Sequence, residues 1–246
     1  MIRKLINITS KTIDYIVLIA LLIILAYGIY SIYSSYAIIN NAKLDDEIIH
    51  LKPSDKTDNS DNIHKLKEFN ENIFAWIELD GTKIDYPMVQ GKDNHEYLRK
   101  DYKGNFAISG AIYLDYKNKK DLSDPYSIVY GHHMDKSAMF GDLDKYKDED
   151  FFNNNTTGKI YLENKTYNLN IFSVIIVSSK DKTIFNIDYL HPMNNSYRLK
   201  YIQEKALYYR DIGANDESKI VALSTCNGSP TNTDRIVVFA VLEESV

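Results

Sequence analysis

The chain is 246 residues long, with 44% hydrophobic and 26% charged residues, a formal charge of −5 and a single cysteine. This length suits one folded domain plus a short additional segment, and the composition excludes a disordered or collagen-like chain. One thiol cannot form a disulfide within its own chain, so a disulfide scaffold is excluded as well. The 29 basic residues are scattered among 34 acidic ones, which argues against nucleic acid as a partner.

The first predicted element is a membrane-spanning helix. Residues 15–33 carry no charged side chain, and a helix of that length spans roughly 28 Å, close to the hydrocarbon thickness of a bilayer. Arg3, Lys4 and Lys11 precede it, so the positive-inside rule places the N-terminus in the cytoplasm and the rest outside the cell. The alternative is a cleaved signal peptide, but the apolar run exceeds the usual hydrophobic region of roughly 7–15 residues, which favours an uncleaved anchor.

The expected organisation is a cytoplasmic N-terminus over 1–13, a transmembrane anchor over 14–34, an extracellular stalk over 35–64 and one folded domain over 65–246. The stalk is predicted because residues 52–62 are almost wholly polar and rich in turn formers. Without its three N-terminal cations the chain holds 26 basic and 34 acidic residues, a charge of −8. An acidic domain is not drawn to anionic lipid, so attachment to the membrane depends on the helix.

The folded domain is predicted to consist mainly of strands. Apolar residues keep helical spacing over 63–73, and two weaker helical stretches are expected near 139–152 and 196–209. Seven or eight short strands with few helices favour a mainly β barrel or sandwich over a parallel α/β sheet. The β-branched and aromatic runs that predict strands cover 83–89, 111–114, 127–130, 159–162, 167–177, 219–225 and 235–242.

Cys226 is the only candidate thiol nucleophile in the chain. It follows the apolar run 220–223 and precedes a loop rich in Gly, Pro and Asn, and loops carried by a rigid sheet are common sites of catalytic residues. A buried, inert cysteine is the ordinary alternative. Outside the cell a lone thiol is an oxidation liability unless it has a purpose, so catalysis and inert packing both stay open at this point.

Two further features lie at strand ends. His132 and His133 follow an apolar run, and because adjacent strand residues point to opposite faces, a metal pair is disfavoured. With one cysteine and no HExxH motif, zinc lacks a ligand set, but one imidazole could act as acid or base for a thiol.

Arg235 opens the last predicted strand nine residues after Cys226. On neighbouring antiparallel strands these two residues share one sheet end, where a guanidinium suits an oxyanion or a substrate carbonyl.

These residues lie in segments that resemble the sortase family, and within it class B. Ala-Leu-Ser-Thr-Cys over 222–226 is similar to the family's Thr-Leu-x-Thr-Cys motif, with Ala in place of the leading Thr. Arg235 follows on the next predicted strand, as the family's arginine does. The class B resemblance also rests on the segments 130–134, 139–143, 81–91 and 94–98, and it covers roughly residues 65–243.

The resemblance implies a closed eight-stranded β-barrel with flanking helices, and a cysteine transpeptidase that needs no cofactor or metal. Cys226 would be the nucleophile, His132 the general acid/base and Arg235 the cation near the oxyanion, with His133 a structural neighbour. The loop 178–192 is similar to the family's specificity element but departs from it in length and sequence. The substrate-binding positions that the resemblance implies are Asn94, Leu98, Ser179, Ile184, Ser224, Thr225 and Asn227.

The resemblance also implies a reaction and its partners. The enzyme would cleave a C-terminal sorting signal after Thr, in an Asn-Pro-x-Thr-Asn-like motif or a Gly-ending variant, through a thioester. It would then transfer the surface protein to an amine of a peptidoglycan precursor, while the N-terminal helix holds it in the lipid bilayer. Two alternatives stay open: a surface thiol peptidase that passes the acyl group to water, and a membrane-tethered binding module in which Cys226 is inert.

Overall fold

The computed structural model describes residues 2–54, 58–190, 195–226 and 233–245. The chain divides into two compact units, Met1–Asn40 and Asn41–Val246. The first consists of one helix, α1 (Ile2–Asn41), which is 40 residues long. Its span Ile13–Tyr36 has a mean hydropathy of 2.5 over its most apolar stretch, with none of that stretch buried. The helix is thus long and apolar enough to cross a membrane. It continues beyond the expected anchor on both sides because no proline interrupts it.

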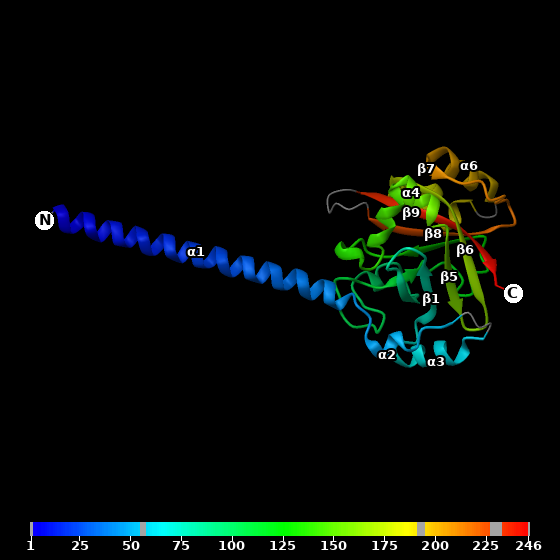
Figure 1. Cartoon of the computed structure of the whole chain (residues 1–246), viewed down its shortest axis with the longest axis horizontal. Coiled ribbons are helices and arrows are strands. Elements are labelled where there is room, and N and C mark those ends of the chain that lie inside the picture. Colours follow the sequence, from blue (N-terminus) through cyan, green and yellow to red (C-terminus); the bar gives the residue numbers. More distant parts are fainter. Residues whose placement is uncertain (1, 55–57, 191–194, 227–232, 246) are drawn as a thin grey trace. The chain divides into compact units, whose positions relative to one another are not determined.

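The second unit is built around one sheet of nine strands among the described residues (Figure 1). Their bounds are β1 (Ile73–Leu79), β2 (Asp85–Val89), β3 (Ile112–Leu114), β4 (Tyr126–Tyr130), β5 (Thr157–Leu162), β6 (Thr166–Ser178), β7 (Ala206–Tyr209), β8 (Lys219–Cys226) and β9 (Asp234–Glu244). The strand order is β5-β1-β2-β3-β4-β8-β9-β6-β7, and a further β5–β6 pairing closes the ring. Eight strands therefore form the barrel, which confirms the predicted closed eight-stranded fold, and β7 pairs with β6 outside it.

Short helices flank the barrel. In chain order they are α2 (Asp46–Ile49), α3 (Ser60–Phe69), η1 (Glu96–Leu98), η2 (Asp135–Ser137), η3 (Gly141–Lys147), α4 (Glu149–Asn154), α5 (Lys182–Phe185), η4 (Ile187–Leu190) and α6 (Asn195–Lys205), where η denotes a 3-10 helix. The helix expected near 139–152 is divided between η3 and α4. The division follows from Asp148, which caps α4 by accepting a hydrogen bond from the Phe151 amide.

Among the described residues three apolar clusters hold this unit together, and strand alternation sorts residues among them. Along β8, Val221 and Leu223 belong to the cluster inside the barrel, whereas Ile220 and Ala222 belong to a cluster on its outer face. Residues from α5 and α6 cover the outer cluster. The third cluster packs residues of α2 and α3 against β1. Neighbouring side chains of one strand thus serve different layers, as the period of two requires.

Part of the segment expected to form a stalk packs on the barrel. Ile48, Ile63 and Leu66 are fully buried in the third cluster, beside Trp76 of β1. The side chain of Lys52 forms ion pairs with Glu78 and Asp85 of β1 and β2. Burial of these apolar side chains stabilises the packing, and the buried Asn59 before α3 donates its amide to the Glu163 carbonyl at 2.9 Å. The folded unit therefore begins at Asn41, before the expected boundary at residue 65.

Two strands were missing from the sequence prediction. β1 is buried on both faces, so it lacks the polar and apolar alternation that marks a strand facing water. The last part of the helix predicted near 196–209 is a strand in the structure, β7, which pairs with β6. In β7, pairing with a neighbouring strand overrides the local helical pattern.

The Asp142 carboxyl should make the stability of the folded unit depend on pH. Burial alone would raise the pKa of this carboxyl, but hydrogen bonds from Ser137, the Lys83 amide and Lys145 outweigh burial and lower the pKa below its usual value. The folded state therefore favours the ionised form, so this stabilisation is present above an ordinary pKa of about 3.9 and is lost as the pH falls through the lower folded-state value.

We expect Asp142→Asn to reduce the free energy of unfolding by about 1–2 kcal/mol near pH 7, and by much less near pH 3. Urea unfolding of the full chain in detergent at both pH values measures the difference. Glu68→Gln, at an exposed carboxyl of α3, is the matched control and should leave stability unchanged. An equal loss at both pH values would contradict the electrostatic explanation.

Candidate active site

The predicted nucleophile and the predicted cation lie on adjacent strands. The antiparallel register of β8 and β9 places Cys226 directly opposite Arg235, as their spacing in the sequence predicts. Nη1 of Arg235 donates to the main-chain carbonyls of Asp234 at 3.2 Å and Thr233 at 3.5 Å. Because a guanidinium has five N–H groups, these contacts use only a minority of its donors among the described residues.

His132 follows β4, which runs parallel to β8. Tyr130 is in register with Ser224, and the Gly131 amide donates to the Ser224 carbonyl at 3.1 Å, so the alignment continues past the end of β4 towards Cys226. Nε2 of His132 lies 2.8 Å from the Leu98 carbonyl oxygen. A carbonyl only accepts, so Nε2 carries the hydrogen and Nδ1 is the nitrogen that can exchange a proton with a reacting group.

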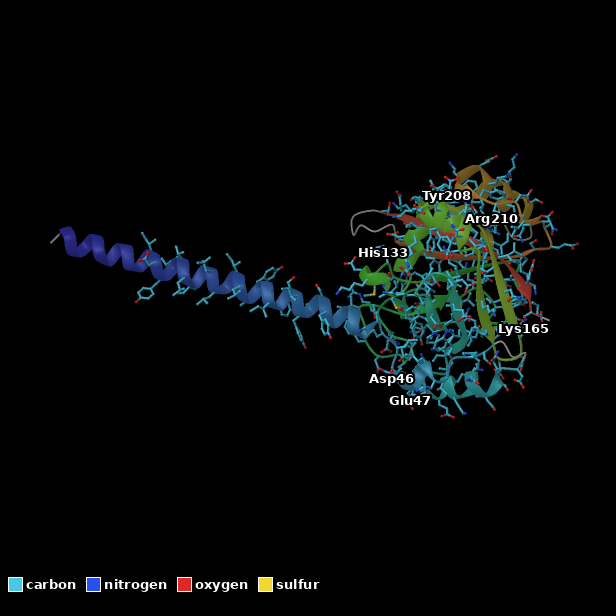
Figure 2. All side chains as sticks on the ribbon, viewed as in Figure 1. Asp46, Glu47, His133, Lys165, Tyr208 and Arg210 are labelled. Carbon is cyan, nitrogen blue, oxygen red and sulfur yellow. The ribbon has the colours of Figure 1, made fainter. Side chains whose placement is uncertain are left out.

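His133 has a different set of partners. Its Nε2 lies 2.9 Å from Oδ2 of Asp144 in η3, and Lys147 contacts the other oxygen of that carboxylate at 3.1 Å. The two imidazoles therefore have separate environments, as expected for adjacent residues at a strand end. His133 is labelled in Figure 2.

The Gly110 backbone lies directly against the His132 ring. Its φ is +61°, and a Cβ at this position would lie 2.8 Å from Cδ2 of His132 and 2.7 and 3.0 Å from the carbonyl oxygens of Tyr97 and Leu98. The sequence prediction did not include this glycine, since its role depends on contacts with residues far away in the chain. Only glycine fits here, because a side chain would strain the backbone and displace the imidazole.

We expect Gly110→Ala to reduce the free energy of unfolding by about 1–3 kcal/mol and to lower kcat of the enzymatic reaction at least about tenfold, because the imidazole must shift. Thermal unfolding and peptide turnover measure the two effects. Gly213→Ala is the matched control: this glycine has a φ of +73° but open space around its Cβ position. It should cost similar backbone strain without loss of turnover, and an equal loss of turnover in both variants would contradict the proposed support of His132.

Asn94 belongs to a hydrogen-bond network around a buried carboxylate. Its Nδ2 donates to Oδ2 of Asp115 at 2.7 Å, and its Oδ1 accepts from the Tyr116 amide at 3.0 Å. The Tyr130 hydroxyl donates to the same Asp115 oxygen at 3.1 Å. Burial and the neighbouring Asp115 carboxylate raise the pKa of Tyr130, so this phenol stays protonated. The sequence prediction missed Asp115, whose only local signal is an acid directly after the apolar run of β3.

The other predicted substrate-binding residues differ in exposure. The Ser179 amide donates to the Thr233 carbonyl at 2.9 Å and extends the β6–β9 ladder beside Arg235. Ser224 and Thr225 are 2% exposed, and their hydroxyls have no hydrogen-bond partner among the described residues. Ile184 is fully buried in the outer cluster. Asn227 lies outside the described residues.

Buried residues fix the segment that carries Ile184. Asp181 caps α5 by accepting hydrogen bonds from the amides of Thr183 and Ile184. The Tyr126 hydroxyl donates to the Ile184 carbonyl at 3.0 Å, and Nε of Arg198 donates to the Thr183 carbonyl at 3.1 Å. The Arg198 guanidinium also stacks 3.8 Å from the centre of the Tyr126 ring. Hydrogen bonds from Tyr126 of β4 and Arg198 of α6 therefore hold α5 in place.

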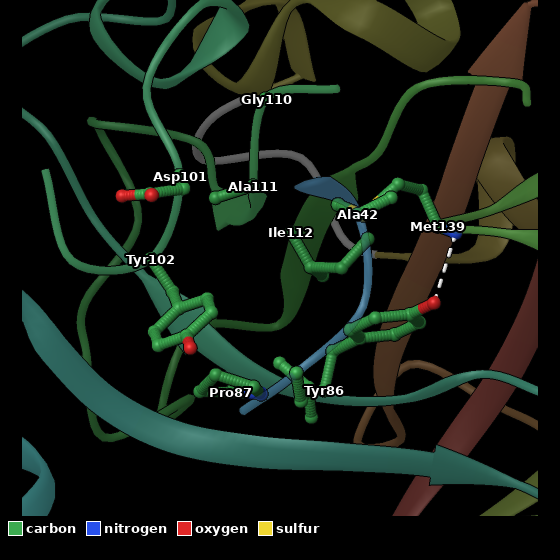
Figure 3. A pocket seen from close by; sticks show the side chains of 10 residues that line it. Ala42, Tyr86, Pro87, Asp101, Tyr102, Gly110, Ala111, Ile112 and Met139 are labelled. Atoms are coloured by element: carbon green, nitrogen blue, oxygen red, sulfur yellow. Dashed lines mark hydrogen bonds between the residues drawn. The ribbon is translucent and has the colours of Figure 1, made fainter. Parts of the chain in front are cut away.

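Two cavities are lined by residues other than the predicted site residues. A void of about 10 Å³ lined by Tyr86, Gly110, Ile112 and Met139 has room for one water at most (Figure 3). A hollow of about 590 Å³ is lined by residues including Lys165, which Figure 2 shows on the other side of the domain from His133. None of the predicted site residues lines either cavity. Among the described residues, no cluster of His, Cys, Asp or Glu could hold a metal ion.

A closed barrel with a cysteine at a strand end, an arginine opposite it and a histidine after the neighbouring strand is the arrangement expected of a cysteine acyl-transfer enzyme. Comparison with known proteins gives the same class, since a family model for the sortase domain matches residues 77–243. The chain belongs to the sortase family of cysteine transpeptidases, and within it to class B.

Its relatives include Sortase B of Staphylococcus aureus, which is 32% identical over 178 residues, covering 71% of this chain and 72% of the relative. The crystal structure of sortase B from Bacillus anthracis matches with a TM-score of 0.73 and 32% identity, covering 87% of this chain and 100% of that one. A class B sortase of Streptococcus pyogenes involved in pilus biogenesis matches with a TM-score of 0.68 and 36% identity, covering 73% of this chain and 97% of that one.

Proposed function

We propose that this class B sortase cleaves a C-terminal sorting signal after Thr, in an Asn-Pro-x-Thr-Asn-like motif or a Gly-ending variant, and transfers the protein to an amine of peptidoglycan. The observation that carries the proposal is the β8–β9 register of Cys226 with Arg235, beside His132 at the end of β4. Its partners are then surface proteins that bear the signal and a cell-wall amine acceptor.

In the first half-reaction the Cys226 thiolate attacks the carbonyl carbon of the Thr residue in the sorting signal, and the carbonyl oxygen becomes an oxyanion. Arg235 is the group proposed to stabilise this oxyanion, since a fixed cation next to developing charge lowers the barrier. His132 donates a proton to the leaving amine as the C–N bond breaks. The product is a thioester between the surface protein and Cys226.

In the second half-reaction the acceptor amine attacks the thioester carbonyl, and the imidazole takes a proton from the amine. The carbon–sulfur bond then breaks, so the new amide forms and Cys226 is released. The exchange of one amide for another thus proceeds as two acyl transfers. Nδ1 of His132 is the atom proposed for both proton transfers, because the Leu98 carbonyl holds the hydrogen on Nε2.

Helix α1 is proposed as an uncleaved membrane anchor with the catalytic unit outside the cell. The apolar span Ile13–Tyr36 has the length for one crossing. Arg3, Lys4 and Lys11 precede it, and cations on this side favour a cytoplasmic N-terminus. Such an anchor would hold the enzyme where secreted proteins and wall precursors meet.

Mass spectrometry of the full chain in detergent, incubated with a panel of sorting peptides, tests the proposal. We expect one peptide class to add its acyl part to Cys226, and an added amine to release a transfer product. Release of free acid only, even with excess amine, would favour a thiol peptidase. A folded chain that forms no adduct with any peptide and resists iodoacetamide would favour a binding module.

A further inference from the structure

Asp115 is a buried carboxylate that the proposed chemistry does not use. It follows β3 directly and is 3% exposed. Among the described residues it forms no ion pair, and the ammonium of the nearby Lys117 pairs with Asp188 instead. A buried charge without a cation is costly unless hydrogen bonds stabilise it. Three donors do so here: Asn94 Nδ2 at 2.7 Å, the Lys117 amide at 3.0 Å and the Tyr130 hydroxyl at 3.1 Å.

The carboxylate fixes the orientation of the Asn94 amide. A carboxylate only accepts hydrogen bonds, so the NH2 group of Asn94 must face Asp115. The Asn94 oxygen then accepts from the Tyr116 amide at 3.0 Å. If the Asn94 side chain were flipped, its oxygen would face the Asp115 carboxylate and its NH2 group would face the Tyr116 N–H. Both contacts would be repulsive. Asn94 is therefore held in one orientation.

An amide held this way still offers a complementary pair of groups. Its NH2 has two hydrogens and its oxygen two lone pairs, and Asp115 and Tyr116 each occupy one. One N–H and one lone pair remain for a ligand. This pair matches another amide, which presents one acceptor and one donor, such as a peptide group or an Asn or Gln side chain.

The same carboxylate connects Asn94 to the strands of the candidate active site. Tyr130 donates to Asp115 and is in register with Ser224, two residues before Cys226. Its ring also contacts that of Tyr113 on β3, with centroids 5.3 Å apart. Asn94 and Tyr130 of β4 thus both donate hydrogen bonds to the buried Asp115 carboxylate.

We propose that Asp115 is a positioning residue, which holds Asn94 in the orientation that binds an amide group of the sorting peptide. The inference rests on the proposed function, because it names the part of the peptide that Asn94 recognises. Asp115 does not contact the reacting atoms, so its loss should weaken peptide binding and leave the reactivity of the thiol intact.

The test compares Asp115→Asn, Asn94→Ala and the double variant in full chain, using the sorting peptide that the wild type cleaves best. We expect Asp115→Asn to raise KM about tenfold with kcat within about twofold, and the double variant to match Asn94→Ala alone, since both changes remove one interaction. Because the chain has one cysteine, the rate of iodoacetamide labelling reports on Cys226 and should stay unchanged. Asp124→Asn is the matched control: it lies in the same loop and bonds Asn118 and the Lys119 amide, so it should leave KM unchanged.

Additive effects of the two single changes, or an equal rise of KM in Asp124→Asn, would overturn the inference and leave the proposed function standing. If Asp115→Asn fails to fold, Asn94→Asp serves in its place. That change puts a second carboxylate against Asp115 and should raise KM more than Asn94→Ala does, and an unchanged KM would overturn the inference. A wild-type chain that forms no thioester with any peptide would overturn the inference and the proposed function together.

Discussion

Replacing Cys226 with alanine should abolish both the acyl-enzyme and the transfer product. The chain contains no other thiol, so no residue can take over the covalent step, and the expected fall in kcat/KM is at least about a thousandfold. Intact mass measures the acyl-enzyme, and chromatography of the products with an added amine measures the transfer.

Cys226→Ser is the companion variant for this prediction. A serine hydroxyl is a far weaker nucleophile than a thiolate, but it keeps the size of the side chain. We therefore expect the serine variant to bind the sorting peptide with a Kd close to the wild-type KM while it forms no product. Undiminished turnover in either variant would rule out the thioester mechanism.

The second large effect is expected at His132. His132→Ala should lower kcat/KM about 10²–10⁴-fold, the range for loss of a general acid/base, because the leaving amine then departs without a proton. His133→Ala should change it by less than about threefold, since it removes only a partly exposed contact with Asp144. Both rates are measured with the same peptide at saturating and limiting concentrations.

Added imidazole separates a chemical role of His132 from a structural one. A small imidazole can supply the missing proton transfer only if the site is otherwise intact, so we expect it to restore part of the turnover of His132→Ala. It should not affect His133→Ala. If His133→Ala proved the more damaging change, the acid/base would be His133.

Much of the barrel could be predicted because its strands carry local signals. β4, β6, β8 and β9 are β-branched and aromatic runs bounded by turn formers. β1 contains such residues as well, but it directly follows the helical spacing of 63–73, which obscures where the strand begins. The segment 35–64 was expected to be a stalk because of its polar run 52–62, but Ile48 and Ile63 on either side of that run pack only when the barrel is present.

For the candidate site, the sequence determined the chemistry and one spatial relation. A single thiol, a histidine after one strand and an arginine nine residues beyond the thiol suffice to predict neighbours at one sheet end, because hairpin geometry fixes where a strand returns. The family resemblance then supplied Asn94 as a further position. None of these inferences requires contacts between distant segments.

Only the tertiary structure decided how those residues are supported. Leu98 accepts from His132, Gly110 lies under its ring, and Asp115 holds Asn94 and Tyr130, although these partners are up to 34 residues apart in the chain. Such hydrogen bonds and close contacts have no sequence period, since they depend on which strands of the barrel become neighbours. The sequence by itself therefore determined which groups could react, and the closed barrel decided their orientation.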